Sequence, residues 1–152
     1  MFYVTKTYGH ELGLSACFRQ WKAKSHCRFL HGYPLSFKLQ FGCNDDELLN
    51  DWVLDFGGLK EVKAWLVDNF DHRMLIADDD PMKDELAALA GLGLANPIII
   101  PGVGCESFAK IVYDRVTDWL GDTRQAPRVF LHSVEVREHG GNSAIYKNEN
   151  AL

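Results

Sequence analysis

Residues 33 to 41 alternate between large apolar and polar side chains, and this pattern constrains the fold more than any other feature of the chain. The apolar set is Tyr33, Leu35, Phe37, Leu39 and Phe41, and the polar set is Ser36, Lys38 and Gln40. Successive side chains of a β-strand point to opposite faces of the sheet. The alternation therefore predicts a strand with one buried and one solvated face.

The length and charge of the chain exclude several classes of protein. It has 152 residues, 47% of them hydrophobic, which is enough for one core and too few for two independent domains. We expect a single domain over residues 1–152. The net charge of −5 comes without a basic run, so nucleic acid is not an expected partner. Its apolar stretches run only a few residues, well below the roughly 20 that cross a bilayer, so no membrane association is expected.

The four cysteines indicate the redox environment. Cys17, Cys27, Cys43 and Cys105 lie far apart, with no CxxC pair, and the N-terminus does not resemble a secretory leader. We therefore expect a soluble cytoplasmic protein with reduced thiols.

The remaining elements follow from weaker periodicities. Residues 2 to 18 alternate mostly like a strand, and residues 58 to 69 show apolar residues at helical spacing. A second helical face spans residues 108 to 119, after a short strand at 98 to 100. The acidic run at 78 to 80 before Pro81 predicts a helix start rather than a cation site. Two closing strands, about 128 to 138 and 143 to 148, are joined by a glycine turn. This order predicts an α+β fold.

Two short segments carry residues suited to acid-base chemistry. Cys27 lies among histidines and arginine, which can hold a thiol as the thiolate so that it acts as base or nucleophile. Asp71 and His72 place a carboxylate next to an imidazole directly after the first helix. Each has a plain alternative: Cys27 as an ordinary loop residue, and the pair as a chance surface neighbour.

Two glutamates are candidates for ligand binding. Glu138 shares strand parity with Val134 and Val136, so a carboxylate ends an otherwise apolar face. Such a group needs a partner when buried, and the paired N–H donors of a guanidine-like heterocycle provide one. The alternative is a frayed strand end with Glu138 in solvent. Glu106 is either a second ligand-binding acid or a first-turn helix carboxylate.

Six short motifs occur in a fixed order along nearly the whole chain. They are Leu14-Ser15-Ala16-Cys17-Phe18-Arg19, Cys27 to Gly32, Asp55-Phe56 with Leu59-Lys60, Phe70-Asp71-His72 with Leu75, Glu106, and Glu138 with Ala144 and Tyr146. In this order they resemble the 6-pyruvoyl- and 6-carboxytetrahydropterin synthase family. The resemblance implies the tunnelling fold, with an antiparallel four-stranded sheet and two main helices on one face. It also implies a ring-forming homo-oligomer, a hexamer of two stacked trimers with active sites between neighbours.

The resemblance assigns roles by position. It implies that Cys27 abstracts a proton from the substrate side chain, with Asp71 and His72 as the partner acid-base unit. Glu138 anchors the pterin ring through its 2-amino and N3 hydrogens, and Glu106 assists. The threonine that the family places before the glutamate is replaced by Gly104.

The metal site departs from the family pattern. The family binds zinc through three histidines, but Phe18 and Tyr33 stand at two of these positions and only His31 remains. His10 shares parity with Phe18 but lies about 26 Å away along a straight strand, too far to replace a ligand. Zinc is therefore a doubtful cofactor. The segment from Phe18 to Lys22 adds a cation and aromatic surface that receives a triphosphate or a ring, or simply packs a loop.

These observations predict a lyase that acts on 7,8-dihydroneopterin triphosphate or a related pterin, in queuosine (deazaguanine) or pterin biosynthesis. Two alternatives stay open. One is a metal-independent pterin lyase or aldolase, because the ring anchor and the acid-base set remain while the Lewis acid does not. The other is a noncatalytic pterin- or purine-binding protein.

Overall fold

The strand β3 (His31–Cys43) runs through the middle of the sheet in the computed structural model, which describes residues 1–149. It pairs with β2 along its first half, with β1 along its second half and with β6 on its other side, always antiparallel. The side chains of Leu35, Phe37, Leu39 and Phe41 are fully buried, whereas Lys38 is exposed. The predicted half-buried strand is confirmed.

The described part of the chain forms one seven-stranded sheet, in the order β5-β4-β2-β3-β6-β7 with β1 beside β3, together with three α-helices. The other strands are β1 (Phe2–Tyr8), β2 (Leu14–Phe18), β4 (Arg73–Ala77), β5 (Pro97–Ile100), β6 (Phe130–His139) and β7 (Asn142–Tyr146). The helices are α1 (Lys60–Phe70), α2 (Lys83–Ala88) and α3 (Cys105–Asp122). The mixed α+β class is confirmed.

The predicted count of four strands is wrong in two respects. The long strand over residues 2 to 18 is broken into β1 and β2 by a 3-10 turn at His10–Leu12, which ends at Gly13 with φ of 63°. This left-handed conformation suits a glycine and stops the extended backbone. The strand β4 was not predicted, and its pairing with β2 and β5 is parallel. Four strands, β1, β3, β6 and β7, pair only antiparallel, whereas β2 pairs antiparallel with β3 and parallel with β4.

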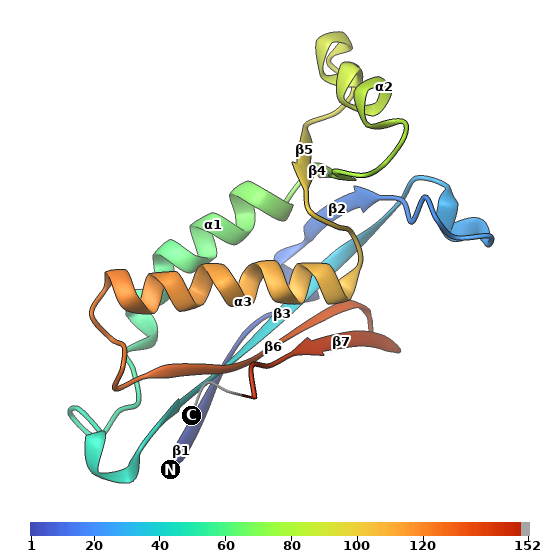
Figure 1. Ribbon diagram of the computed structural model, residues 1–152. Helices are drawn as coiled ribbons and strands as arrows, with labels where there is room; N and C mark the ends of the chain where they lie inside the picture. The colour runs from blue at the N-terminus through green and yellow to red at the C-terminus, as the bar shows by residue number, and fades with distance from the viewer. Residues whose placement is uncertain (150–152) are drawn as a thin grey trace.

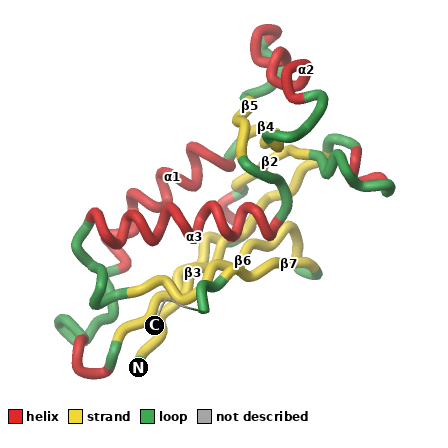
Figure 2. Tube along the Cα trace, viewed as in Figure 1, coloured by secondary structure: helices red, strands yellow, loops and turns green. Residues whose placement is uncertain are grey.

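The helices α1 and α3 lie over the same face of the sheet (Figures 1 and 2). The fully buried side chains of α3 include Phe108, Val112 and Val116, and Leu66 of α1 is buried with them in the same core. Apolar residues at three- and four-residue spacing thus face the sheet, as the predicted helical segments require. The short helix α2 projects away from this core beyond β4 and β5 (Figure 1). Within residues 1–149, no helix is both long and apolar enough to cross a membrane.

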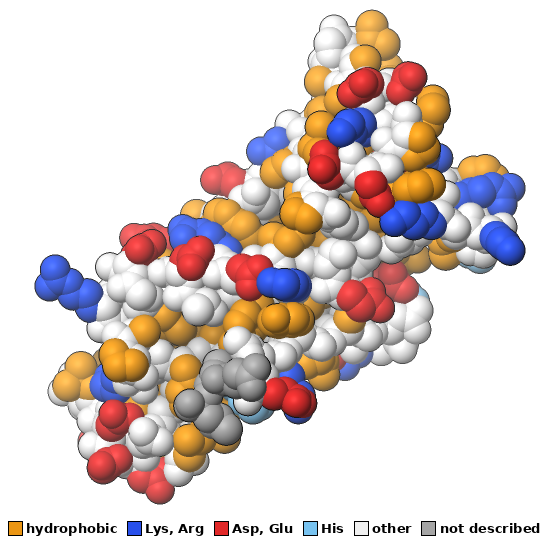
Figure 3. All heavy atoms as spheres, viewed as in Figure 1, with side chains coloured by type: hydrophobic (Ala, Val, Ile, Leu, Met, Phe, Trp, Pro, Cys, Tyr) orange, Lys and Arg blue, Asp and Glu red, His pale blue; other side chains and the backbone are white. Residues whose placement is uncertain are grey.

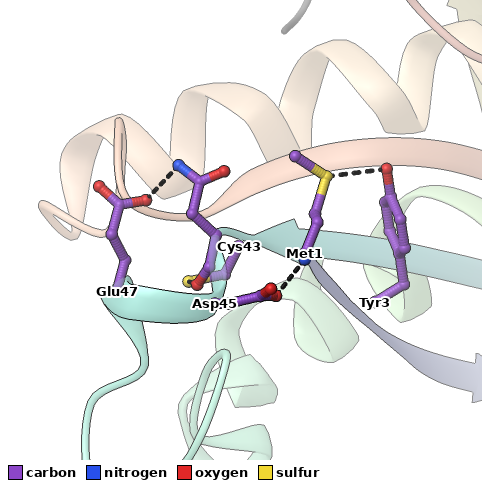
Figure 4. Close-up of polar contacts among 6 residues, drawn as sticks. Met1, Tyr3, Cys43, Asp45 and Glu47 are labelled. Atoms are coloured by element: carbon purple, nitrogen blue, oxygen red, sulfur yellow. Dashed lines mark hydrogen bonds and ion pairs between the residues drawn. The ribbon is translucent and has the colours of Figure 1, made fainter.

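The start of β1 is tied to the turn that follows β3 (Figure 4). The amino group of Met1 pairs with the carboxylate of Asp45, and the Tyr3 hydroxyl donates to the Met1 sulfur at 3.1 Å. In the same turn, the Asn44 amide donates to Glu47 at 2.7 Å. The Met1–Asp45 pair therefore holds the start of β1 beside the end of β3, its antiparallel partner.

Replacing Phe37 with alanine is expected to lower the free energy of unfolding by about 3–5 kcal/mol, because the cavity left behind cannot close fully. Phe37 is 0% exposed, and its ring lies 4.8 Å from that of Phe70, centroid to centroid. The matched control is Phe29→Ala, at a position that is 58% exposed. Urea denaturation of both variants measures the difference, and equal losses would contradict the buried position of Phe37.

Candidate functional site

A cavity of about 170 Å³ lies where β2, β3 and β6 approach the start of α3. Four of the predicted site residues line it: Cys27, His31, Glu106 and Glu138. They come from four separate segments of the chain, so only the folded protein brings them together. This cavity is the candidate functional site.

Cys27 is held at the cavity by a short, capped turn. It lies in the 3-10 turn His26–Arg28, where the Ser25 hydroxyl accepts a hydrogen bond from the Cys27 amide at 3.4 Å. The Cys27 carbonyl accepts from the amide of Gln20 at 2.9 Å. All four cysteines lie within the described residues and are free thiols, and Cys27 is partly exposed. The thiol is thus positioned by its backbone and open to a ligand.

The two glutamates approach the cavity from different elements. Glu138 lies within β6 with its side chain 22% exposed, so the alternative of a frayed strand end is wrong. Its Oε1 accepts a hydrogen bond from the Asn142 amide at 2.9 Å. Glu106 is exposed in the first turn of α3, where a carboxylate also stabilises the helix N-terminus. Two acids are therefore available to one ligand.

The three positions that the resemblance assigns to zinc ligands do converge, but they form an aromatic cluster. The ring centroids of Phe18 and His31 are 5.5 Å apart, those of Phe18 and Tyr33 are 6.2 Å apart, and those of His31 and Tyr33 are 5.4 Å apart. A zinc site needs at least three nitrogen, sulfur or oxygen ligands from the protein. Residues 1–149 contain no group of three or more His, Cys, Asp or Glu side chains that could hold a metal ion. The residues present do not fit zinc.

Two groups beside Glu138 are kept in their protonated forms. Burial raises the pKa of Tyr33, and the nearby charge of Glu138 adds to this effect. Burial likewise raises the pKa of Cys105 to about 11, again with help from Glu138 and Glu106. At neutral pH the wall of the cavity therefore offers a neutral phenol and a neutral thiol.

The Asp71-His72 pair does not join this cavity within one subunit. Asp71 Oδ1 lies 2.8 Å from His72 Nδ1 and accepts a hydrogen bond from the Ser15 amide at 3.2 Å. His72 lines a second cavity of about 250 Å³ together with Cys17 and Gly32. The Asp71 carboxylate therefore orients the His72 imidazole, but the pair lies outside the cavity that contains Cys27.

Strand register explains this separation. Phe18 of β2 is opposite His31 of β3, and Cys17 is opposite Gly32. Because neighbouring residues of a strand point to opposite faces, the two cavities lie against opposite faces of the β2–β3 pair. The thiol of Cys27 and the imidazole of His72 thus lie on different sides of one subunit.

The cations of the segment from Phe18 to Lys22 are already paired. Arg19 donates two hydrogen bonds to Asp80, at 2.8 and 2.6 Å, and Lys22 Nζ lies 2.7 Å from Asp79. The indole of Trp21 also donates to Asp79, at 3.1 Å. Basic side chains lie at the tip of the loop between β2 and β3, and others are scattered over the rest of the face shown in Figure 3. The acidic run of residues 78 to 80 thus anchors this loop.

Replacing Asp80 with asparagine is expected to destabilise the fold by about 1–3 kcal/mol at neutral pH, since charged hydrogen bonds are lost. The Asp80 side chain is 2% exposed, and its hydrogen bonds with Arg19 lower its pKa. A carboxylate with a lowered folded-state pKa stabilises above its unfolded pKa, and this contribution is lost as the pH falls through the folded value. Urea denaturation from about pH 6 to about pH 2 should show a smaller acid-induced loss in Asp80→Asn than in the wild type. An unchanged acid response would contradict this, and Asp118→Asn is the exposed control.

Gln20 is a cavity residue that belongs to the predicted segment from Phe18 to Lys22, but its contact with the residues before α3 was not predicted. Its side-chain amide donates to the Val103 carbonyl at 3.0 Å and lines the candidate site. Gly104, with φ of 107°, leaves room for it, because a Cβ at this position would come within 2.4 Å of the Gln20 Nε2. The only signal in the sequence is the glycine at the place of the family's threonine.

The family model of 6-pyruvoyl tetrahydropterin synthase matches residues 9–149 of this chain. The chain belongs to this family. A relative named 6-carboxy-5,6,7,8-tetrahydropterin synthase, from Aquifex aeolicus, is 31% identical over 141 residues, which cover 90% of this chain and 85% of that protein. One of the same name from Rickettsia felis is 36% identical over 58 residues, covering 38% of this chain and 41% of that protein. The predicted pterin-synthase class of enzyme, a lyase, is confirmed at the level of the family.

Solved structures match the fold of this family member over nearly its whole length. An uncharacterized protein of Wolinella succinogenes has a TM-score of 0.81 at 20% identity, covering 97% of this chain and 98% of that one. The 6-pyruvoyl tetrahydropterin synthase of Plasmodium falciparum has a TM-score of 0.62 at 16% identity, covering 97% of each chain. At these identities the matches establish the fold alone.

Proposed function

We propose that this chain is a 6-carboxy- or 6-pyruvoyltetrahydropterin synthase-like lyase that acts on 7,8-dihydroneopterin triphosphate or a related reduced pterin. The observation that carries the proposal is the single cavity in which Cys27 lies with Glu138 and Glu106. A thiol for proton transfer and two carboxylates for a heterocycle rich in N–H groups are the parts that such a reaction needs.

In this proposal Glu138 binds the pterin ring. The 2-amino group and N3 of a reduced pterin present two N–H donors side by side, which suits a carboxylate. Glu138 keeps acceptor capacity beyond its one hydrogen bond from Asn142, because an ionised carboxylate accepts several. Glu106 supports the ring from the start of α3.

Cys27 acts on the side chain of the bound pterin. As the thiolate it takes a proton from a side-chain carbon, and the proton is then available for return to the substrate as groups of the side chain leave. Asp71 and His72 form the second acid-base unit, with the imidazole oriented by the carboxylate 2.8 Å away. Because this pair faces away from Cys27 within a subunit, we assign it to the site of a neighbouring copy.

In a ring-shaped homo-oligomer, a hexamer of two stacked trimers, Cys27 of one copy and the Asp71-His72 pair of a neighbouring copy form one site. Within residues 1–149, β1 pairs only with β3 and β7 pairs only with β6, so each leaves one strand edge open. Open edges favour pairing with another chain, and a closed ring removes them. Light scattering tests the assembly, and a monomeric mass would overturn both the ring and the shared site.

We place the reaction in queuosine (deazaguanine) or pterin biosynthesis, in the cytoplasm. The names of the Aquifex and Rickettsia relatives support the 6-carboxytetrahydropterin branch. The aromatic cluster of Phe18, His31 and Tyr33 favours a second candidate, a metal-independent pterin lyase or aldolase, because it supplies no metal ligand set.

The test is turnover of 7,8-dihydroneopterin triphosphate by purified protein, followed by mass spectrometry of the products. A 6-carboxy or 6-pyruvoyl tetrahydropterin product supports the first candidate, and cleavage of the side chain of dihydroneopterin to a shorter one supports the second. Tight pterin binding without turnover under any metal supplement would contradict both candidate enzymes. It would favour a noncatalytic pterin- or purine-binding protein.

A further inference from the structure

The aromatic cluster of Phe18, His31 and Tyr33 provides a hydroxyl group at the place where the family resemblance expects a metal. We propose that this site binds its substrate without a resident zinc ion, and that the Tyr33 hydroxyl donates a hydrogen bond to an oxygen of the substrate side chain. The identity of that substrate as a pterin rests on the proposed function. The absence of a resident zinc ion does not rest on the proposed function.

No small movement of the cluster brings a metal-binding atom to the position that Phe18 occupies. It is 2% exposed, and its ring packs edge-on against Phe108 with centroids 5.2 Å apart. Both residues belong to the main hydrophobic core. This side of the cluster therefore presents carbon atoms, and rotation of Phe18 would open the core.

His31 contributes at most one ligand atom. Its Nδ1 lies 2.7 Å from the Phe29 carbonyl, which can only accept, so this nitrogen carries a hydrogen. The neutral ring then has its lone pair on Nε2. One nitrogen does not hold zinc, which takes at least three protein ligands.

Tyr33 supplies a hydrogen-bond donor in a fixed position. Its ring contacts the rings of Phe18, His31 and His139, the last with centroids 6.1 Å apart. Within residues 1–149 its hydroxyl has no hydrogen-bond partner, although it lies in the wall of the cavity that contains Cys27 and Glu138. Because packing fixes the Tyr33 ring, its hydroxyl is preorganised to donate a hydrogen bond to an oxygen of a ligand.

This donor suits the reaction that Cys27 would perform. Once loss of a side-chain group has produced a carbonyl, removing a proton from the next carbon places negative charge on the carbonyl oxygen in the transition state. A preorganised O–H donor stabilises such charge, as a metal ion would, without a metal ligand set. Tyr33 and Cys27 would thus act on neighbouring atoms of the same side chain.

The first test counts metal and needs no turnover. Wild-type protein, purified without chelator and titrated with Zn²⁺, is expected to hold far less than one zinc per chain by elemental analysis after gel filtration. Phe18→His/Tyr33→His, which restores three histidines, is expected to hold about one zinc per chain. Stoichiometric zinc in the wild type would overturn the proposal, whether or not the double variant folds.

The second test concerns the hydroxyl. Tyr33→Phe is expected to lower kcat about 100-fold with little change in KM, as for loss of an oxyanion donor. It should also reduce about 10-fold the preference of the protein for dihydroneopterin over 7,8-dihydropterin, which lacks the side chain. Tyr3→Phe, at a tyrosine outside the cavity, is the matched control. If Tyr33→Phe changes neither kcat nor this preference, the role of the hydroxyl is wrong. If the wild type binds no pterin, the proposed function and the hydroxyl role fall together, and the zinc count still stands by itself.

Discussion

Replacing Cys27 with alanine is expected to lower kcat for the reduced pterin by about 10²–10⁴-fold, the usual contribution of a positioned acid or base. Pterin affinity should change little, because the ring is bound by Glu138 and Glu106 on other elements of the cavity. Steady-state kinetics give kcat, and ligand fluorescence gives the affinity.

Cys43→Ala is the matched control for this prediction. Cys43 is also a free thiol, but it lies at the end of β3 and lines neither the Cys27 cavity nor the His72 cavity. It should retain most of the activity, measured per folded molecule. Full activity in Cys27→Ala would show that the thiol has no catalytic role.

Replacing Glu138 with glutamine is expected to weaken pterin binding by about 10- to 100-fold, which corresponds to the loss of one charged hydrogen bond. The substitution keeps the shape and one acceptor oxygen, so the contact with Asn142 can persist. Because the amide is neutral and donates from its nitrogen, it cannot accept from two N–H groups of the ring. Titration calorimetry with a reduced pterin measures the change.

Glu135→Gln tests whether any acid of β6 has this effect. Glu135 has a side chain that is 13% exposed and pairs with Arg137 at 2.6 Å, away from the cavity. Its substitution should leave pterin affinity unchanged. Equal affinity of Glu138→Gln and wild type would show that the ring is anchored elsewhere.

The central strand and the two long helices were predictable because each has a strong period. Residues 33 to 41 alternate, and the apolar residues of α1 and α3 recur at helical spacing, so local sequence and burial agree there. The strand β4 has four successive buried residues and therefore no alternation to detect. The break between β1 and β2 depends on one backbone conformation at Gly13, which periodicity does not register.

The candidate site was predictable residue by residue but not as an arrangement. Cys27, His31, Glu106 and Glu138 were expected from their types and motifs, and they meet in one cavity. The position of Asp71 and His72 on the opposite face depends on the register of β2 with β3 and β4, which only the paired strands reveal. The pairing of Arg19 with Asp80 joins residues 61 positions apart, so no local pattern predicts it.

The interlock of Gln20 with Gly104 restricts how this site can change during evolution. A side chain at position 104 would collide with the Gln20 amide, and the φ of 107° disfavours any residue but glycine there. Exchange of Gly104 for the threonine of the family therefore requires that the Gln20 amide move away from the Val103 carbonyl and that the backbone before α3 be reshaped. We expect relatives with a threonine at this position to have a different backbone conformation before α3.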